Sequence, residues 1–293
     1  MKITNITRSL ATLLVCVSAH SFGATTHINQ EFKDYWYAGD AELSSYKLQQ
    51  ARYGELNEGK AVLIYVSEQF LPKIQVKADS VKDSNIGVLK LNKHKSFLTG
   101  IYPYTIMTST FSPINNEGHA IKVTNTTQEW CGNAYSQLNN RGLFEIQSHS
   151  YFEGEADKAF SLKQATLEDE LWTKIRLDPA NLPQGDHQVI PSMEYSRLLH
   201  IETKAYAAKL TLVKAAQTST YSIAYPALNR TLTITFNNEF PYVIQGWKDT
   251  YKSGFDANAK VLTSSATLIS TIKEKYWAQH NNKHRKLRKK LGL

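Results

Sequence analysis

Alternation of apolar and polar residues with a period of two recurs along most of this chain, and it constrains the fold more than any other feature. Runs rich in Thr, Val, Ile and Tyr are separated by short stretches of turn residues, as between 43–53 and 61–70. Such runs are typical of strands that bury one face. Fourteen candidate strands follow from this pattern, enough for one large sheet or two stacked ones. They are 43–53, 61–70, 87–92, 96–99, 101–111, 119–128, 130–139, 143–152, 197–201, 205–213, 219–225, 231–236, 242–247 and 262–272.

One segment has the helical period instead. Thr166 can serve as the N-cap, three acidic residues follow it, and Leu167, Leu171, Trp172 and Ile175 form an apolar stripe. Pro179 stops the pattern. The spacing predicts an amphipathic helix over about 166–177 that lies on the sheet.

The connections between successive strands are short, and this favours antiparallel pairing, because parallel crossovers need a dozen or more residues. We therefore expect a mainly β fold: a large curved antiparallel sheet, or an open barrel or sandwich, with one amphipathic helix packed on it. Folds of this kind often enclose an apolar cavity.

The amino-terminal segment has the pattern of an export signal. Lys2 and Arg8 precede the apolar run 10–19, and Ser21 and Gly23 supply the small residues that a signal peptidase requires. We expect residues 1–23 to be removed, and a single antiparallel β domain over 24–280 to be periplasmic or secreted. No second run approaches the roughly 20 apolar residues of a membrane helix, so the sequence does not predict a transmembrane protein. An alternative is acylation at Cys16, which would make the chain a lipoprotein.

The formal charge of +8 is concentrated at the carboxyl end. Two basic residues lie in the export segment and six in the tail, and the remaining 26 basic residues balance the 26 acidic ones. The basic tail 281–293 can be a solvated terminus, or it can contact an anionic envelope surface such as lipid, lipopolysaccharide or polymer. Nucleic acid is not an expected partner, because an exported chain without a base-reading motif has no use for one.

The region 130–152 predicts a hairpin whose register can be chosen from residue type. A three-residue loop over 140–142 pairs Leu138 with Phe144 and separates apolar from polar faces, whereas a two-residue loop mixes them. We therefore expect opposed residues to have numbers that sum to 282.

In that register Cys131, Asn133 and His149 share one face, with Cys131 and His149 as diagonal neighbours. A thiolate, an imidazole and an amide are the components of a nucleophilic catalytic site. These three residues are thus the candidate catalytic residues of a cysteine-dependent hydrolase or acyl transferase. A structural thiol is the alternative, since no helix N-terminus or cation is evident beside Cys131.

The sequence predicts no metal site and no cofactor. Histidines at 27, 94, 119, 187, 200 and 280 lack the spacing of metal ligands. Glu153, Glu155 and Asp157 are spaced by two but lack the remainder of a calcium-loop pattern, so we interpret them as a solvated loop. No glycine-rich phosphate loop and no Gly-x-Ser-x-Gly motif are present.

Several stretches are similar to a group of exported bacterial proteins of unknown function that are often labelled septum formation inhibitor Maf. These stretches are 36–42 (WYAGDAE), 50–55 (QARYGE), 102–109 (YPYTIMTS), 129–131 (EWC), 148–155 (SHSYFEGE) and 291–293 (LGL). Maf proteins proper are cytoplasmic α/β nucleotide pyrophosphatases with a Ser-x-Ser-Pro-Arg-Arg phosphate loop, and nothing in this chain matches that loop. The resemblance therefore implies an exported protein, and it assigns no catalytic or binding residue in this chain.

Three functions remain as hypotheses. The first is a non-enzymatic cell-envelope protein whose curved sheet binds a lipid or other amphiphile, or an envelope partner. The second is the cysteine-dependent enzyme, and the third is nucleotide hydrolysis according to the label.

Overall fold

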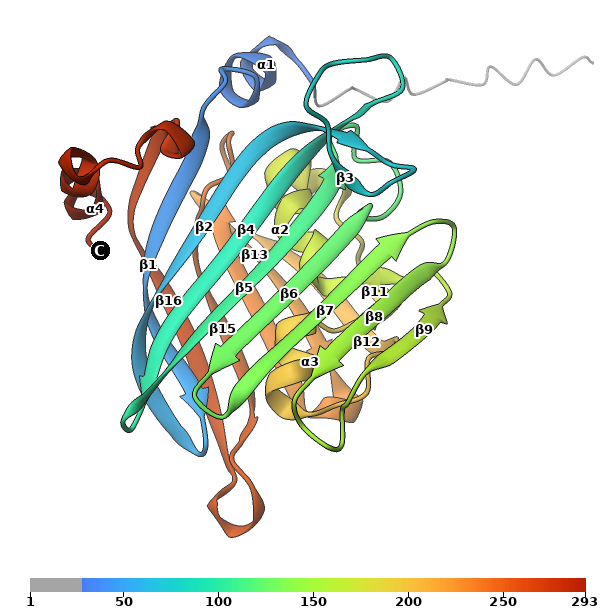
Figure 1. Ribbon diagram of the computed structural model, residues 1–293, viewed down its shortest axis with the longest axis vertical. Coiled ribbons are helices and arrows are strands. Elements are labelled where there is room, and N and C mark those ends of the chain that lie inside the picture. Colours follow the sequence, from blue (N-terminus) through green and yellow to red (C-terminus); the bar gives the residue numbers. More distant parts are fainter. Residues whose placement is uncertain (1–27) are drawn as a thin grey trace, which may run out of the picture.

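One continuous sheet of 16 strands organises the protein and curves into two facing walls (Figure 1). The computed structural model describes residues 28–293. The strands are β1 (Ala41–Arg52), β2 (Glu55–Leu71), β3 (Val76–Lys77), β4 (Ile86–Thr99), β5 (Tyr102–Pro113), β6 (Lys122–Glu129), β7 (Gly132–Asn140), β8 (Phe144–Ser150), β9 (Lys158–Leu162), β10 (Thr166–Leu167), β11 (Gly185–Ile190), β12 (Tyr206–Lys214), β13 (Thr218–Tyr225), β14 (Arg230–Asn237), β15 (Ile244–Ser253) and β16 (Lys260–Glu274). The α-helices are α1 (Gln30–Trp36), α2 (Glu168–Leu177), α3 (Met193–Leu199) and α4 (Lys286–Lys290). Short 3₁₀ helices cover Pro179–Asn181, Pro226–Leu228, Asp256–Asn258, Tyr276–Ala278 and Asn282–Arg285.

The strand order places the first and the last strand, β1 and β16, side by side in the middle of the sheet. It runs β10-β11-β12-β13-β14-β15-β16-β1-β2-β4-β5-β6-β7-β8-β9, with β3 paired to β2. Neighbouring strands are antiparallel, except that β10 pairs in parallel with β11. The predicted fold class is confirmed.

The sheet is open along one line, which we call the seam. β9 and β10 are its two edges, and only residues 163–165 connect them. Fully extended, this connection spans at most about 14 Å between Leu162 and Thr166, so the edges lie close together. No ladder joins β9 to β10 or β11 in the described part of the chain.

The helices α2 and α3 fill the space between the two walls (Figure 1). Every residue of α2 except Lys174 is buried or nearly so. On one side the Trp172 ring meets Trp247 of β15 edge-on at 5.2 Å, and on the other the Thr173 hydroxyl lies 2.5 Å from the Ser112 hydroxyl of β5. The predicted helix is thus confirmed, and it packs inside the curve of the sheet.

The start of this helix differs from the prediction. Thr166 belongs to β10, and Leu167 occupies the N-cap position. The Leu167 N–H donates to the Glu170 carboxylate at 3.2 Å, so an acidic side chain of the first turn does the capping.

A second helix replaces one of the predicted strands. The segment 197–201 was predicted as a strand, which is wrong, because α3 spans Met193–Leu199. The Ser192 hydroxyl accepts the Tyr195 N–H at 3.1 Å and begins the helix, and His200 ends it in the left-handed conformation at φ 54°.

The predicted register of the hairpin is also wrong. Leu138 pairs with Ile146 and Asn140 with Phe144, so opposed numbers sum to 284. The loop is 141–143, because Asn140 still pairs and its side chain accepts the Gly142 N–H at 3.4 Å. The shift of two residues preserves the faces, and therefore Leu138, Phe144 and Ile146 remain buried together.

The ends of the chain complete the fold. The predicted export signal 1–23 and Cys16 lie outside the described residues. None of the described helices is long and apolar enough to cross a membrane. The basic segment 281–293 forms α4 and then returns to the sheet, where Leu291 is buried.

Candidate functional site

A layer of charged side chains lies between the two walls of the sheet. Lys93 and Lys95 point inward from β4, where their ammonium groups approach Glu194 of α3 at 3.5 and 2.6 Å. Lys93 also lies 3.7 Å from Asp169 of α2. All four side chains are buried, and their ion pairs join α2 and α3 to the β4 wall.

Arg230 makes the corresponding link to the opposite wall. From β14 it donates two hydrogen bonds to Glu168 of α2, at 2.6 and 2.8 Å, and two to Asp249 of β15, at 2.8 and 2.9 Å. A second bidentate pair joins Arg176 to Glu42 of β1, with both bonds at 2.6 Å. These arginines fix α2 from both of its ends.

The pKa values of the buried Glu194 and Asp169 are shifted in opposite directions. Burial alone would raise the pKa of Glu194, but the Lys95 and Lys93 ammonium groups outweigh it and lower the pKa to about 2. Burial raises the pKa of Asp169 to about 6, with Lys93 opposing the shift and Glu168 adding to it. Asp169 therefore titrates near neutral pH, whereas Glu194 stays ionised.

This charged layer leaves no room for a ligand. The cavity between its side chains measures about 20 Å³, which is space for one water molecule. The interior between these side chains is consequently a packed structural element.

A cavity of about 420 Å³ opens at the seam, between the inner face of β7–β9 and α3. Its volume is within the usual range for small-molecule sites. The residues that line it are Ser136, Ile146, Ser148, Gly154, Glu155, Lys158, Phe160, Leu162, Met193, Ser196, Arg197, His200, Ile201, Glu202 and Thr203.

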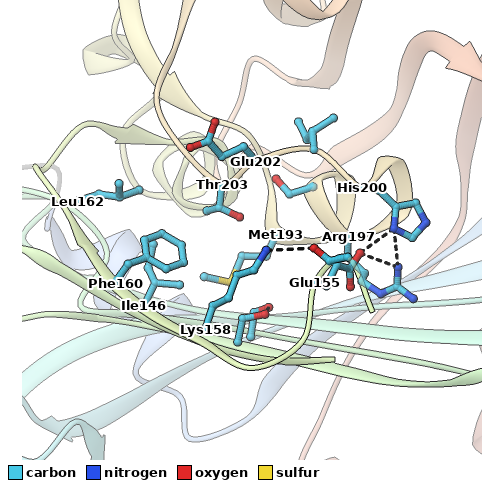
Figure 2. A pocket seen from close by; sticks show the side chains of 15 residues that line it. Ile146, Glu155, Lys158, Phe160, Leu162, Met193, Arg197, His200, Glu202 and Thr203 are labelled. Atoms are coloured by element: carbon cyan, nitrogen blue, oxygen red, sulfur yellow. Dashed lines mark hydrogen bonds and ion pairs between the residues drawn. The ribbon is translucent and has the colours of Figure 1, made fainter. Parts of the chain in front are cut away.

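The cavity has an apolar part and a charged part (Figure 2). Ile146, Phe160, Leu162 and Met193 lie toward one end, where Glu202 and Thr203 also line the cavity. At the other end Glu155 accepts hydrogen bonds from Arg197 at 3.2 Å and from His200 at 2.7 Å. The cavity therefore presents both apolar and charged surface.

Lys158 is placed differently from the other charged residues of the cavity. Its ammonium group donates to the Gly154 carbonyl at 3.3 Å and forms no ion pair with another described residue. The charge of Arg197, in contrast, is balanced by Glu155. Lys158 thus carries an uncompensated positive charge at the polar side of the cavity.

The structure does not bring the predicted catalytic residues together. Cys131 lies in the turn between β6 and β7, and His149 pairs with Tyr135, four residues away and about 13 Å along the strand. His149 instead faces Asp157, with Nδ1 at 3.2 Å from Oδ1. Asn133 pairs with Gln128, and its carbonyl accepts the Tyr151 N–H at 3.3 Å. The His149 imidazole is therefore out of reach of the Cys131 thiol.

The Cys131 thiol is exposed and free. The Glu129 carboxylate, which accepts the Cys131 N–H at 2.7 Å, raises the pKa of the thiol through hydrogen bonding and charge. We expect iodoacetamide to alkylate it slowly at pH 7, and Glu129→Gln to accelerate alkylation several-fold, because more thiolate is then present. Rates followed by mass spectrometry, with Glu145→Gln as the control for an exposed carboxylate elsewhere, check this; equal rates in both variants would contradict it.

The remaining sequence candidates separate into two groups. Glu155 was interpreted as part of a solvated loop, which is wrong, because it links Arg197, His200 and the Ser150 hydroxyl. Asp157 remains exposed. In residues 28–293 no cluster of three or more His, Cys, Asp or Glu side chains could hold a metal ion.

Sequence reasoning missed the residues that form the seam cavity. Lys158, Phe160 and Arg197 carry no motif, and they meet only because β9 is an edge of the sheet and α3 lies inside it. The polar alternation of β9 was the one available signal, but it gives no strand order.

Fold and cavity together define the class of this protein: an open antiparallel sheet, filled by two helices, with one amphiphilic cavity at its seam. No protein-family model matches the chain, and no curated protein matches its sequence. Among solved structures it is similar to a β-barrel-like protein of a domain of unknown function, DUF1849, from Brucella abortus. That similarity has 8% sequence identity and a TM-score of 0.47, and it covers 80% of this chain and 97% of the other.

Proposed function

We propose that the protein is a non-enzymatic binding protein of the cell envelope that holds one amphiphilic molecule in the seam cavity. The observation that carries the proposal is the cavity of about 420 Å³ with both apolar and charged side chains in its lining. The pattern of residues 1–23 and the resemblance to exported bacterial proteins support a periplasmic or secreted location.

The lining suggests how such a molecule would lie. An apolar chain would fill the space beside Ile146, Phe160 and Leu162, where burial of apolar surface contributes about 25 cal/mol per Å². A polar head would lie beside Lys158 and Arg197. The Ser196 hydroxyl and Arg197 Nε have no hydrogen-bond partner within the described chain, so a bound polar group or water would satisfy them.

Native mass spectrometry and solvent extraction of the purified full-length protein test this function. A co-purifying amphiphile that is released by organic solvent supports it. A protein that carries no such molecule and that takes up no fluorescent fatty acid contradicts it. If a second protein instead occupies the seam, its co-purification identifies the envelope partner and the amphiphile proposal fails.

Phe160→Glu is expected to weaken binding of a fluorescent fatty acid at least about tenfold, because it places a charge in the apolar end of the cavity. Ala159→Glu is the matched control: it adds the same charge on the same strand, but on the opposite and exposed face. Fluorescence titration measures both dissociation constants. Equal losses in the two variants would show that the cavity is not the site.

A second part of the proposal concerns the partner surface. The basic carboxyl segment supports contact with an anionic envelope surface, since six of its Lys and Arg side chains are exposed. Attraction of this kind is non-specific and weakens with salt.

A further inference from the structure

The basic carboxyl segment is clamped to the outer face of the sheet. Along β2, Ala61, Leu63 and Tyr65 face the interior, and the alternate residues Ile64 and Val66 face outward, where they pack with Leu291 and Leu293. Two hydrogen bonds reinforce this contact: the Ser45 hydroxyl donates to the Leu291 carbonyl at 2.5 Å, and the Lys60 ammonium to the Gly292 carbonyl at 3.1 Å. Figure 1 shows α4 and the C-terminus on the outside of β1 and β16.

A groove of about 460 Å³ lies between this segment and the sheet. Its floor is apolar and comes from three strands: Leu43 of β1, Val62 and Ile64 of β2, and Ile272 of β16. This groove is on the opposite side of the sheet from the interior helices, and none of its lining residues lines the seam cavity.

The rim of the groove is positively charged. Arg285 and Arg288 line it together with His94, His280 and His284, and Glu274 is the single acidic side chain of the described lining. Burial and the neighbouring Arg288 lower the pKa of His94, which is consistent with a positive field at this rim.

Further cations surround the rim. Within 281–293, six side chains are exposed and form no ion pair with another described residue: Lys283, Arg285, Lys286, Arg288, Lys289 and Lys290. One anionic headgroup could engage only one or two of them. Their number and spread therefore fit a surface of many anions better than a single soluble ligand.

We propose that the groove receives one acyl chain of an anionic phospholipid from a bilayer whose headgroups lie against the basic segment. The inference rests on the proposed contact with an anionic surface and names its chemistry. The charge of the rim complements the lipid phosphates, and the apolar floor accommodates the chain.

Sedimentation of the full-length protein with vesicles tests the surface contact. We expect binding to vesicles of phosphatidylcholine that contain phosphatidylglycerol, at least tenfold weaker binding to phosphatidylcholine alone, and a similar loss in a variant that combines Lys286→Gln, Lys289→Gln and Lys290→Gln. Absence of any preference for anionic vesicles overturns both the surface contact and the inference.

A phosphatidylglycerol with a diazirine on its acyl chain tests the groove itself. We expect cross-links to peptides that contain residues 62–64 and 272–288, and a several-fold loss of cross-linking in Val62→Gln while sedimentation is retained. Thr267→Gln, on the exposed outer face of β16, is the matched control and should change neither. Sedimentation without cross-links in the groove, or cross-links confined to the seam cavity, overturns the inference and leaves the surface contact standing.

Discussion

Replacing Arg230 with methionine is expected to lower the free energy of unfolding by about 3–5 kcal/mol, the usual cost of removing one partner from a buried ion pair. The guanidinium donates two hydrogen bonds to Glu168 and two to Asp249, and its carbon lies 3.8 Å from the centre of the Tyr195 ring. Methionine fills much of the space, but it removes the guanidinium to which Glu168 and Asp249 are hydrogen-bonded and leaves them only the more distant charges of Lys93 and Lys95. The effect is therefore electrostatic rather than a loss of volume.

Urea unfolding followed by tryptophan fluorescence measures this change. Lys248→Met on the neighbouring strand is the matched control, since Lys248 is exposed and its replacement should change stability by less than about 0.5 kcal/mol. Two further substitutions, Glu168→Leu and Asp249→Leu, added to Arg230→Met should recover part of the loss, because they remove the two carboxylates that have lost their hydrogen-bonded partner. A loss below about 1 kcal/mol for Arg230→Met alone would show that the charged layer is not a structural element.

The fold class could be predicted from the sequence because each strand buries one face and exposes the other. This constraint produces a period of two that is visible in almost every strand. The helix α2 could be predicted for the same reason, since its stripe of Leu171, Trp172 and Ile175 is core packing. These features depend on local sequence alone.

The sequence analysis did not predict the charged layer, because the lysines of β4 interrupt the apolar alternation of the strand. The ranges 87–92 and 96–99 were predicted as two separate strands, which is wrong, because β4 runs from Ile86 to Thr99 without a break through Lys93 and Lys95. The alternation was present: Leu91, Lys93 and Lys95 all face inward. A prediction from local pattern assigns lysine to the exposed face of a strand. Its burial here is possible only because the carboxylates of α2 and α3 pair with it, and those helices are distant in sequence.

The sequence also contains the signal for the start of α3. Ser192 follows Pro191, and Glu194 lies two residues later in the first turn, which is typical of a helix start. The seam cavity had no such signal. Its position depends on which strands become the edges of the sheet and on the three-residue connection 163–165, and strand order cannot be derived from alternation.

The charged layer also predicts how stability depends on pH. Asp169 has a folded pKa of about 6 against an ordinary value of 3.8, so the folded state binds this proton more tightly than the unfolded chain does. Lowering the pH from 7.5 to 5 should therefore stabilise the protein through Asp169, by about 1 kcal/mol. The stabilisation is lost again as the pH rises through 6.

Glu194 acts in the opposite direction at lower pH. Its folded pKa of about 2 lies below the ordinary value of 4.5, so the stability that it contributes is present above pH 4.5 and is lost as the pH falls toward 2. The loss is on the order of 3 kcal/mol when complete. Glu42 and Glu168, whose pKa values are also lowered because their arginine partners outweigh burial, add to it.

Asp169→Asn separates these contributions. The variant cannot take up the proton. When the pH is lowered from 7.5 to 5, the free energy of unfolding of the parent protein should therefore rise by about 1 kcal/mol relative to that of the variant. The groups that face Asp169 are Lys93, Glu168 and Glu194, and all three remain in the variant. His94 opposes the rise in both proteins, because its lowered pKa favours the unfolded chain as the pH falls. Urea unfolding at several pH values measures the difference, and one that stays constant across this range would show that Asp169 titrates outside it.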